Sequence, residues 1–422
     1  MRKQLLLTLF SVMALTVTAQ KYVGGDISLL TQYENAGAIY KDKNGNAVSN
    51  LISYYKSIGL NSMRIRLFVD PSKASDDEKK AGAIQDLDYV IALGKRIKNA
   101  GMTLVLDFHY SDTWADPSNQ WTPDAWKSLG DTELYSEIYN YTKNCLNKLK
   151  EEEVTPDFIQ IGNEISYGML WGAKGTSSPK KCYTNSSANW GRFVNLLKKA
   201  NEACKEVCPD AKTIIHSERA AQLSVLTAFL DKISEVNYDI IGLSYYPDYH
   251  KDLATLETTL TKLESQYSSK KIMIVETGYS YSWSLDNATY DYTGTYPYTE
   301  EGQRKFTADL VTMLNKHNNV IGLYWWFPED NEYNIVYKNG SADWSKQLRG
   351  FWNAALYDHT TGKPYAALFE LPNFNPNSSG ISSLKYTAPE NNIWYDLSGK
   401  RMTNKPTSKG IYINNGRKII VK

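Results

Sequence analysis

The stretch Phe158-Ile-Gln-Ile-Gly-Asn-Glu164 has the pattern of a buried β-strand that ends on a carboxamide and a carboxylate. Pro156 precedes it and a glycine-containing loop at 168–175 follows it, as is typical of a strand covered on both faces of a parallel sheet. The stretch Lys271-Ile-Met-Ile-Val-Glu276 repeats the pattern and ends on a second glutamate. Because the strand C-termini of an α/β barrel meet on one rim, we expect the two carboxylates to lie near each other.

On both sides of these stretches, strand-like and helix-like segments alternate, which is typical of βα units and a parallel sheet. The expected strands are 23–28, 62–68, 103–109, 158–164, 213–216, 239–246, 271–276 and 320–326. The expected helices are about 48–58, 87–99, 131–152, 189–207, a shorter one before 239, 252–267, 299–317 and a last one within about 350–370. The predicted fold class is α/β, a (β/α)8 TIM barrel with a small C-terminal β-rich tail.

The two ends of the chain do not continue this alternation of strand-like and helix-like segments. A basic start and an apolar run indicate a signal peptide at 1–19, so we expect export to the periplasm, the cell surface or the outside of the cell. The barrel domain is expected at 20–372, followed by a linker at 373–383 and a β-rich tail at 384–422. The tail is interpreted either as a sorting or docking element or as a small packed appendage.

Composition narrows the range of partners. The net charge is +1, which favours neither nucleic acid nor an anionic membrane surface, whereas the 31 Tyr and 11 Trp suit contacts with sugar rings. No segment after the signal peptide reaches the roughly 20 apolar residues of a membrane span. The four cysteines could form disulfides or stay free, and Cys204 and Cys208, one helical turn apart, are poorly placed to pair with each other. The other two cysteines are Cys145 and Cys182.

The two glutamates have the chemistry that cleavage of a glycosidic bond requires. We predict that Glu164 is the proton donor and general base and that Glu276 is the nucleophile, with carboxyl groups about 5–5.5 Å apart. Asn163 is expected to bind the sugar 2-hydroxyl. An acidic loop residue is the plainer interpretation of Glu164, but the second strand ending on Glu276 favours the catalytic one.

Other strand ends support this interpretation. Candidate substrate-binding residues there are Arg64, Arg66, Asp107, His109, His216, Tyr246, Trp325 and Trp326. We expect one or both arginines to point into the barrel mouth, where an arginine would keep Glu276 ionised. Trp325 and Trp326 alternate in direction, so only one is expected under the sugar. For each of these candidate residues, the alternative is a structural role in a polar layer of the barrel or in its core. The long loops 110–128 and 165–188, with Trp114 in the first, are expected to build the cleft.

The chain resembles glycoside hydrolase family 53, the clan A endo-β-1,4-galactanases, across about residues 22–372. The motifs that carry the resemblance are Gly-Gly-Asp26-Ile-Ser, Arg64-Ile-Arg66-Leu, Asp107-Phe-His-Tyr-Ser-Asp112-Thr-Trp114-Ala-Asp116-Pro, Gln160-Ile-Gly-Asn-Glu164-Ile, Ser244-Tyr-Tyr-Pro247 and Val275-Glu276-Thr-Gly-Tyr. The resemblance implies retaining endo-hydrolysis of β-1,4-galactan in type I arabinogalactan and pectic rhamnogalacturonan I, by a monomer that needs no cofactor. It adds Asp26, Asp112 and Tyr245 to the expected substrate-binding residues. At strand six the chain has Ser-Tyr-Tyr where many clan relatives have His-x-Tyr.

Two questions stay open at this stage. Some family members bind calcium between the loops after strands seven and eight, and Asp286, Asn287 and Asp291 could supply oxygen ligands here or form only a polar turn. Another clan A activity, on mannan or β-1,4-glucan, is the alternative within enzymes. A non-catalytic glycan-binding protein is the alternative outside them.

Overall fold

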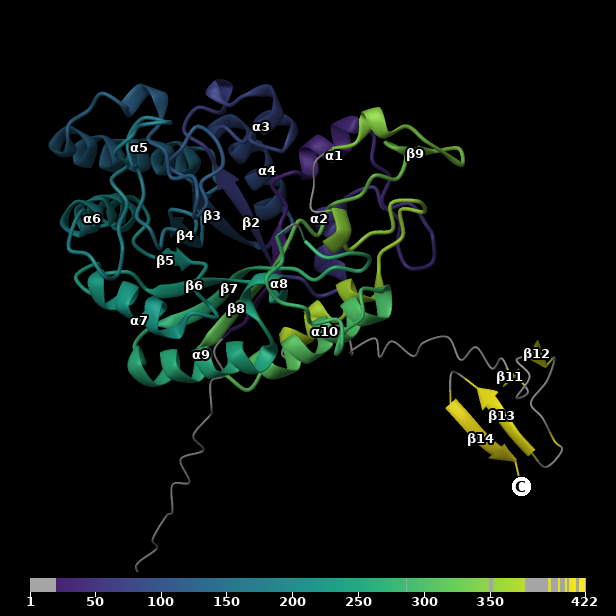
Figure 1. The fold of residues 1–422 in the computed structure, drawn as a ribbon. Helices are drawn as coiled ribbons and strands as arrows, with labels where there is room; N and C mark the ends of the chain where they lie inside the picture. The colour runs from purple at the N-terminus through teal and green to yellow at the C-terminus, as the bar shows by residue number, and fades with distance from the viewer. Residues whose placement is uncertain are drawn as a thin grey trace, which may run out of the picture. The chain divides into compact units, whose positions relative to one another are not determined.

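The computed structural model describes residues 20–285, 287–348 and 352–375, together with 394–395, 401–402, 407, 410–414 and 417–421. Eight parallel strands close into a barrel in chain order (Figure 1). They are β1 (Tyr22–Asp26), β2 (Ser62–Leu67), β3 (Thr103–Phe108), β4 (Phe158–Ile161), β5 (Lys212–Ser217), β6 (Ile240–Tyr245), β7 (Lys271–Thr277) and β8 (Val320–Trp326). The predicted (β/α)8 barrel is thereby confirmed.

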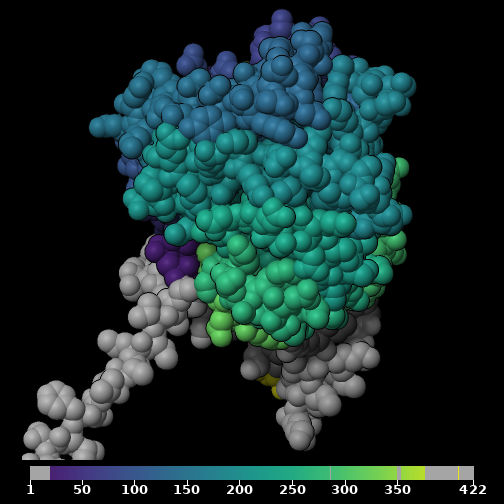
Figure 2. Space-filling model, turned by 90° about the vertical axis from the view of Figure 1, so that its left-hand side faces the viewer, coloured from purple at the N-terminus to yellow at the C-terminus, as the bar shows by residue number. Residues whose placement is uncertain are grey.

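Helices connect the barrel strands. They are α1 (Leu30–Ala36), α2 (Leu51–Ser57), α3 (Asp76–Lys80), α4 (Leu87–Asn99), α5 (Asp131–Glu151), α6 (Trp190–Val207), α7 (Leu223–Lys232), α8 (Pro247–His250), α9 (Leu253–Gln266) and α10 (Glu300–Leu314). The longer ones bury one face, whereas α3 has no buried residue and α8 is a single turn. Figure 2 shows blue, teal and green bands following one another over the face formed by α5 to α9, as expected when successive βα units lie side by side. Side-chain caps fix several starts: Asp86 accepts the N–H of Tyr89 in α4, and Asp252 accepts that of Thr255 in α9.

The expected last α-helix within 350–370 was wrong. The described residues there form short 3-10 turns, Trp352–Ala354, Ala366–Phe369 and Leu371–Phe374. Gly362 adopts a φ of 72°, and Pro364 and Pro372 cannot donate the N–H that a continuous helix needs. A small hairpin that the sequence did not predict, β9 (Tyr337–Lys338) and β10 (Ser341–Ala342), follows the last barrel strand.

The barrel interior has an apolar layer and a polar layer. The apolar layer is one buried cluster of Val105, Phe158, Ile214, Ile240, Met273, Val275, Ile321 and Tyr324. Strand side chains point inward at every second position, so the next inward residue after Val105 is Asp107, and the next after Ile214 is His216. The polar layer therefore lies toward the strand C-termini, where a barrel carries its site.

The C-terminal part forms a separate compact unit, 379–422, apart from the unit 1–378. Its strands β11 (Trp394–Tyr395), β12 (Arg401–Met402), β13 (Gly410–Asn414) and β14 (Arg417–Val421) pair antiparallel in the order β12-β11-β13-β14. The predicted signal peptide and most of the predicted linker lie outside the described residues. Among the residues that are described, no helix combines the length and apolarity needed to cross a bilayer. All four cysteines are buried and free.

Candidate active site

The end of β4 turns sharply and aims Glu164 away from the sheet. Gly162 adopts a φ of 81°, and a Cβ there would lie 2.7 Å from Ile165. Glu164 itself has a φ of 49°, a left-handed conformation that is unfavourable for a residue with a side chain. Such strain persists where the surroundings hold it and concentrates at functional sites. The strand therefore ends at Ile161, earlier than predicted, and the strained turn places Glu164 on the rim.

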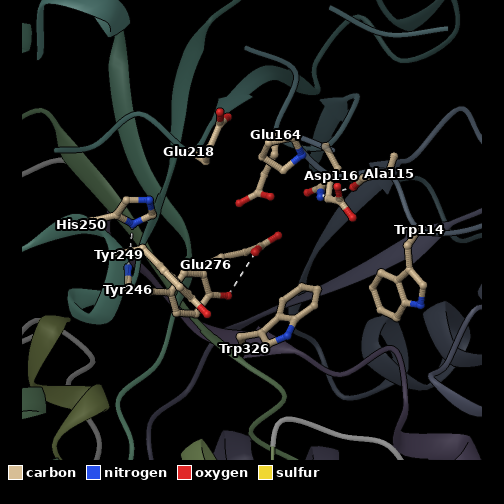
Figure 3. Close-up of a pocket in the computed structure, with 12 residues that line it drawn as sticks. Trp114, Ala115, Asp116, Glu164, Glu218, Tyr246, Tyr249, His250, Glu276 and Trp326 are labelled. Atoms are coloured by element: carbon tan, nitrogen blue, oxygen red, sulfur yellow. Dashed lines mark hydrogen bonds between the residues drawn. The ribbon is translucent and has the colours of Figure 1, made fainter. Parts of the chain in front are cut away.

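Glu164 and Glu276 line one cavity of about 370 Å³ and point toward each other across it (Figure 3). Glu164 follows β4 and Glu276 is near the end of β7, so both stand at the C-terminal rim where the sequence placed them. The complete lining is Trp114, Ala115, Asp116, Pro117, Asn163, Glu164, Glu218, Tyr246, Tyr249, His250, Glu276 and Trp326. Four carboxylates and four aromatic side chains in one cavity provide both hydrogen-bond acceptors and flat faces for a polyhydroxylated ligand.

Glu276 lies between a cation and a phenol. Its Oε1 is 3.0 Å from Arg64 Nη2, and its Oε2 accepts a hydrogen bond of 3.1 Å from Tyr246 Oη. Burial raises the pKa of Glu276 to about 7, and the Arg64 guanidinium acts in the opposite direction. Arginine therefore favours the ionised form of this carboxylate and fixes its orientation.

Glu164 has different neighbours. Its Oε1 lies 2.6 Å from Ser244 Oγ, on the inner face of β6. Burial raises the pKa of Glu164 well above its ordinary value, and the negative charges of Glu276 and Glu218 add to the effect. A carboxyl group in these surroundings holds its proton at a pH at which an ordinary glutamate has lost it.

Arg64 connects the polar layer of the barrel. This fully buried guanidinium donates to Asp26 Oδ2 and Asp107 Oδ2, both at 2.8 Å, and to Asn163 Oδ1 at 3.0 Å. Asp107 also faces His109 Nε2 at 3.0 Å. Buried charges need this degree of pairing to offset their lost hydration. The network consequently holds Arg64 rigidly beside the carboxylate at the end of β7.

Two tryptophans on one side of the cavity pack against Arg66 of the polar layer. The Arg66 guanidinium lies 4.4 Å from the ring centre of Trp114 and 5.3 Å from that of Trp326, a cation–π arrangement. Trp326 lines the cavity, whereas Trp325 is fully buried in the core and donates from Nε1 to Ala354 O at 3.0 Å. Only one of the adjacent tryptophans therefore reaches the cavity, as the alternation predicts.

The structure sorts the predicted substrate-binding residues into three groups. Those that line the cavity are Trp114, Asn163, Tyr246 and Trp326. Those buried in the polar layer behind its wall are Asp26, Arg64, Arg66, Asp107, His109 and His216. The remaining three, Asp112, Tyr245 and Trp325, lie away from the cavity. Asp112 joins two loops by accepting the N–H groups of Asp70 and Asp124, and Tyr245 Oη donates to Lys251 O.

Sequence reasoning missed several residues of the site. Asp116, Glu218, Tyr249 and His250 line the cavity, and Gln160 and Ser244 belong to the polar layer. Gln160 and Ser244 are polar positions within otherwise apolar strands, and Glu218 directly follows β5. These three residues could therefore have been identified as site candidates from the sequence. Glu218 is held by Ser166 and by Arg219, whose Nε is 2.8 Å away.

Within the described ranges, no group of three or more His, Cys, Asp or Glu is placed to hold a metal ion. Asp286 lies outside the described residues. Asn287 adopts a φ of 58°, and the Asp291 carboxylate accepts hydrogen bonds from Thr293 N and Oγ1. The calcium prediction is therefore not tested.

A (β/α)8 barrel with paired buried carboxylates and an aromatic wall at its strand C-termini has the features of a barrel glycosidase. Residues 22–369 match the model of glycosyl hydrolase family 53, and the chain belongs to this family.

Relatives and solved structures agree with this assignment. A protein of Neosartorya fischeri named probable arabinogalactan endo-β-1,4-galactanase A is 34% identical over 77% of this chain and 89% of its own. A solved Ignisphaera aggregans GH53 catalytic domain is 30% identical, with a TM-score of 0.69 over 86% of this chain and 98% of that one. A solved fungal β-1,4-galactanase is 28% identical, with a TM-score of 0.68 over 84% and 99%.

Proposed function

We propose that this protein is a retaining endo-β-1,4-galactanase that cleaves type I arabinogalactan and pectic galactan. The observation that carries the proposal is the pair of glutamates on one cavity, one beside a guanidinium and the other beside a hydroxyl and further carboxylates. The difference matches the two roles that a retaining enzyme needs, an ionised nucleophile and a protonated acid.

In the first step, Glu276 attacks the anomeric carbon while Glu164 gives its proton to the departing glycosidic oxygen. Arg64 and Tyr246 hold the Glu276 oxygens, so the attacking oxygen is oriented before substrate arrives. In the second step, Glu164, now ionised, takes a proton from water, which attacks the glycosyl-enzyme bond and releases the sugar.

Asn163 is well placed for the sugar 2-hydroxyl. Its Oδ1 accepts from Arg64, one Nδ2 hydrogen goes to Ala115 O at 2.8 Å, and the residue lines the cavity. The second Nδ2 hydrogen therefore remains for the substrate, in a contact that strengthens at the transition state. Trp326 lies beside Glu276 in the same cavity and offers a flat face there (Figure 3).

The choice of galactan rests on the relatives, because a carboxylate pair does not select the sugar. Proteins named as arabinogalactan endo-β-1,4-galactanases match about three quarters of this chain. Galactose differs from glucose in its axial 4-hydroxyl, and one mismatched hydrogen bond can decide specificity. The basic and apolar start of the chain supports the further proposal that the enzyme is exported to act on polymeric substrate.

Release of reducing ends from β-1,4-galactan, β-mannan and cellulose tests the proposal. We expect rapid release from galactan and little from the other two polymers. Faster release from mannan or cellulose would show that this polymer, and not galactan, is the substrate. Tight galactan binding without release of reducing ends would indicate a glycan-binding protein instead.

A further inference from the structure

We propose that Ser244 and His216 form a hydrogen-bond chain in which each group donates to the next in a fixed order. This order keeps the proton on Glu164 until substrate takes it. The chain runs from Glu164 through Ser244 and His216 to Asn163. This inference rests on the proposed function, because it assigns positioning residues to the proposed acid. It is built from three contacts: Glu164 Oε1 to Ser244 Oγ at 2.6 Å, Ser244 Oγ to His216 Nε2 at 2.8 Å, and His216 Nδ1 to Asn163 Oδ1 at 2.9 Å.

The direction of the chain is set at its far end by the amide of Asn163. Arg64 Nη2 donates to Asn163 Oδ1 at 3.0 Å, and Asn163 Nδ2 donates to Ala115 O at 2.8 Å. Exchanging the amide oxygen and nitrogen would place an NH2 group against a guanidinium and an oxygen against a carbonyl. The oxygen of Asn163 therefore faces His216.

An oxygen acceptor at 2.9 Å requires a hydrogen on His216 Nδ1. The ring is fully buried, and burial lowers its pKa well below its ordinary value, so it carries only one hydrogen. That hydrogen is on Nδ1, and Nε2 has a lone pair. The Glu164 N–H is directed at Nδ1 and taken alone would favour the other tautomer, but at 3.3 Å it is the longest of the three contacts made by this nitrogen, and the oxygen at 2.9 Å outweighs it.

Gln160 does not oppose this assignment, although its Nε2 is 3.1 Å from His216 Nδ1. Its two Nε2 hydrogens have nearer or equal partners in Asp107 Oδ1 at 2.7 Å and Gly162 O at 3.1 Å. Arg64 Nε donates to its Oε1 at 3.3 Å, which fixes the orientation of this amide as well.

Counting hydrogens then fixes the state of Glu164. The lone pair of His216 Nε2 needs the one hydroxyl hydrogen of Ser244. Ser244 can then only accept from Glu164, so the three contacts of the chain are satisfied when Glu164 is protonated. After Glu164 has given its proton away, the Ser244 hydrogen must rotate toward the carboxylate, and Nε2 loses its partner. The chain therefore favours the protonated acid by about one hydrogen bond.

The position of Ser244 comes from an irregularity in the sheet. The register between β6 and β7 shifts between Leu243 and Ser244, so that Ser244 pairs with Glu276. A shift of this kind re-aims the following side chain. It brings the Ser244 hydroxyl between Glu164 and the imidazole of His216, which stands on β5.

Other groups also act on Glu164. The charged or titratable side chains that act on Glu164 or share its cavity are Asp116 of the loop after β3, Glu218 after β5, Tyr246 and His250 after β6, and Glu276 of β7. The carboxylates raise the pKa of Glu164 by charge repulsion. A change at Ser244 or His216 leaves these groups in place, so the contribution of the chain can be measured separately.

The first test is the tautomer of His216 in the wild-type protein, read from the nitrogen-15 shifts of its ring. We expect a hydrogen on Nδ1 and a lone pair on Nε2 at neutral pH. A ring protonated on Nε2 would overturn the chain. This measurement needs no substrate, so it stands even if the protein proves inactive on galactan, an outcome that would contradict only the proposed function.

The second test is the alkaline limb of the kcat/KM profile, which reports ionisation of the acid. In His216→Leu, Ser244 is free to donate to ionised Glu164, so the limb should move to lower pH by about 0.5–1 unit. In a Ser244→Ala background the same substitution should cause no further shift, and Ser244→Thr should keep the wild-type limb. An unmoved limb in His216→Leu, or an equal shift in both backgrounds, would overturn the proposal.

Discussion

The surroundings of Glu164 and Glu276 differ although both side chains are glutamates at strand ends on one cavity. Glu276 meets the Arg64 guanidinium at 3.0 Å and the Tyr246 hydroxyl at 3.1 Å. Glu164 meets the Ser244 hydroxyl and feels the charges of Glu276 and Glu218. Burial raises the pKa of both, so burial does not distinguish them. The neighbours are what the proposed function uses to give one carboxylate the attack and the other the proton transfer.

These neighbours come from different strands. Arg64 lies on β2, two positions after Ser62 on the same inner face, and is held by Asp26 and Asp107. Ser244 lies on β6 at a register shift. The barrel therefore gives the two carboxylates different surroundings by closing strands that are distant in sequence around one cavity.

The largest effect we expect comes from removing either carboxylate. Glu276→Ala should lower kcat on galactan by at least about 10⁴-fold, and an activated aryl leaving group should not restore it, because the attacking group is absent. Glu164→Ala should lose about 10²–10⁴-fold on galactan and recover most of its first-step rate on the activated substrate, which needs no protonation. Equal responses of the two variants to leaving-group quality would contradict the comparison.

Removing the cation should damage the fold as well as the site. Arg64→Met leaves Asp26, Asp107 and Glu276 without their shared partner, and we expect the free energy of unfolding to fall by about 3–5 kcal/mol. Arg96→Met is the matched control, because the Arg96–Glu34 pair is about one third exposed and should contribute less than about 1 kcal/mol. Denaturant melts measure both. Similar losses in the two variants would show that Arg64 is not the hub of the polar layer.

A smaller effect should come from the aromatic wall. Trp114→Ala should lower kcat/KM on polymeric galactan by about 10–200-fold, the range for one lost pocket contact. Trp121→Ala is the control, since Trp121 packs edge-on against Trp171 and does not line the cavity. Kinetics on galactobiose-type and longer substrates, with a melting curve for each variant, separate the roles. Loss of stability without dependence on substrate length would make Trp114 a packing residue under Arg66.

The smallest effect should appear in the pH dependence of the melting temperature when Glu332 is replaced. Glu332 is a buried acid in the loop after β8. Burial raises its pKa to about 8, with the charge of Asp330 adding. The folded state then binds the proton more tightly than the unfolded chain, so this contribution is complete at low pH and is lost as pH rises toward 8. Glu332→Gln should flatten the fall of Tm between pH 5 and 8, whereas Glu235→Gln on the surface should not. An unchanged slope in Glu332→Gln would show that burial alone does not raise carboxyl pKa values here.

Much of the fold could be predicted because its signals are local. The helix at 87–99 has the predicted bounds, and the strands fall within a few residues of expectation. The error at 158–164 arose because the apolar pattern continues while Gly162 and Glu164 already turn the backbone. The expected last helix failed because Gly362 and Pro364 interrupt it, a signal that was present in the sequence.

The two glutamates of the site could be predicted because each ends a strand, and alternation correctly separated Trp325 from Trp326. Asp116 reaches the cavity from a loop, and Tyr249 and His250 reach it from the single-turn helix α8, so no periodicity in the sequence could place them. The partners of Arg64 and Ser244 depend on how the barrel closes. The sequence therefore indicated the two carboxylates that share the cavity, whereas the structure was needed for the contacts that distinguish them.

The assignment of roles is tested most directly by the anomeric configuration of the azide adducts formed by Glu276→Ala and Glu164→Ala from an activated aryl β-galactobioside. In Glu276→Ala, azide should replace the nucleophile, attack from the opposite face and give an α-galactosyl azide. In Glu164→Ala, azide should replace water on the glycosyl-enzyme and give the β-galactosyl azide. Both follow from a retaining double displacement. The opposite configurations, or the same configuration from both variants, would contradict the account.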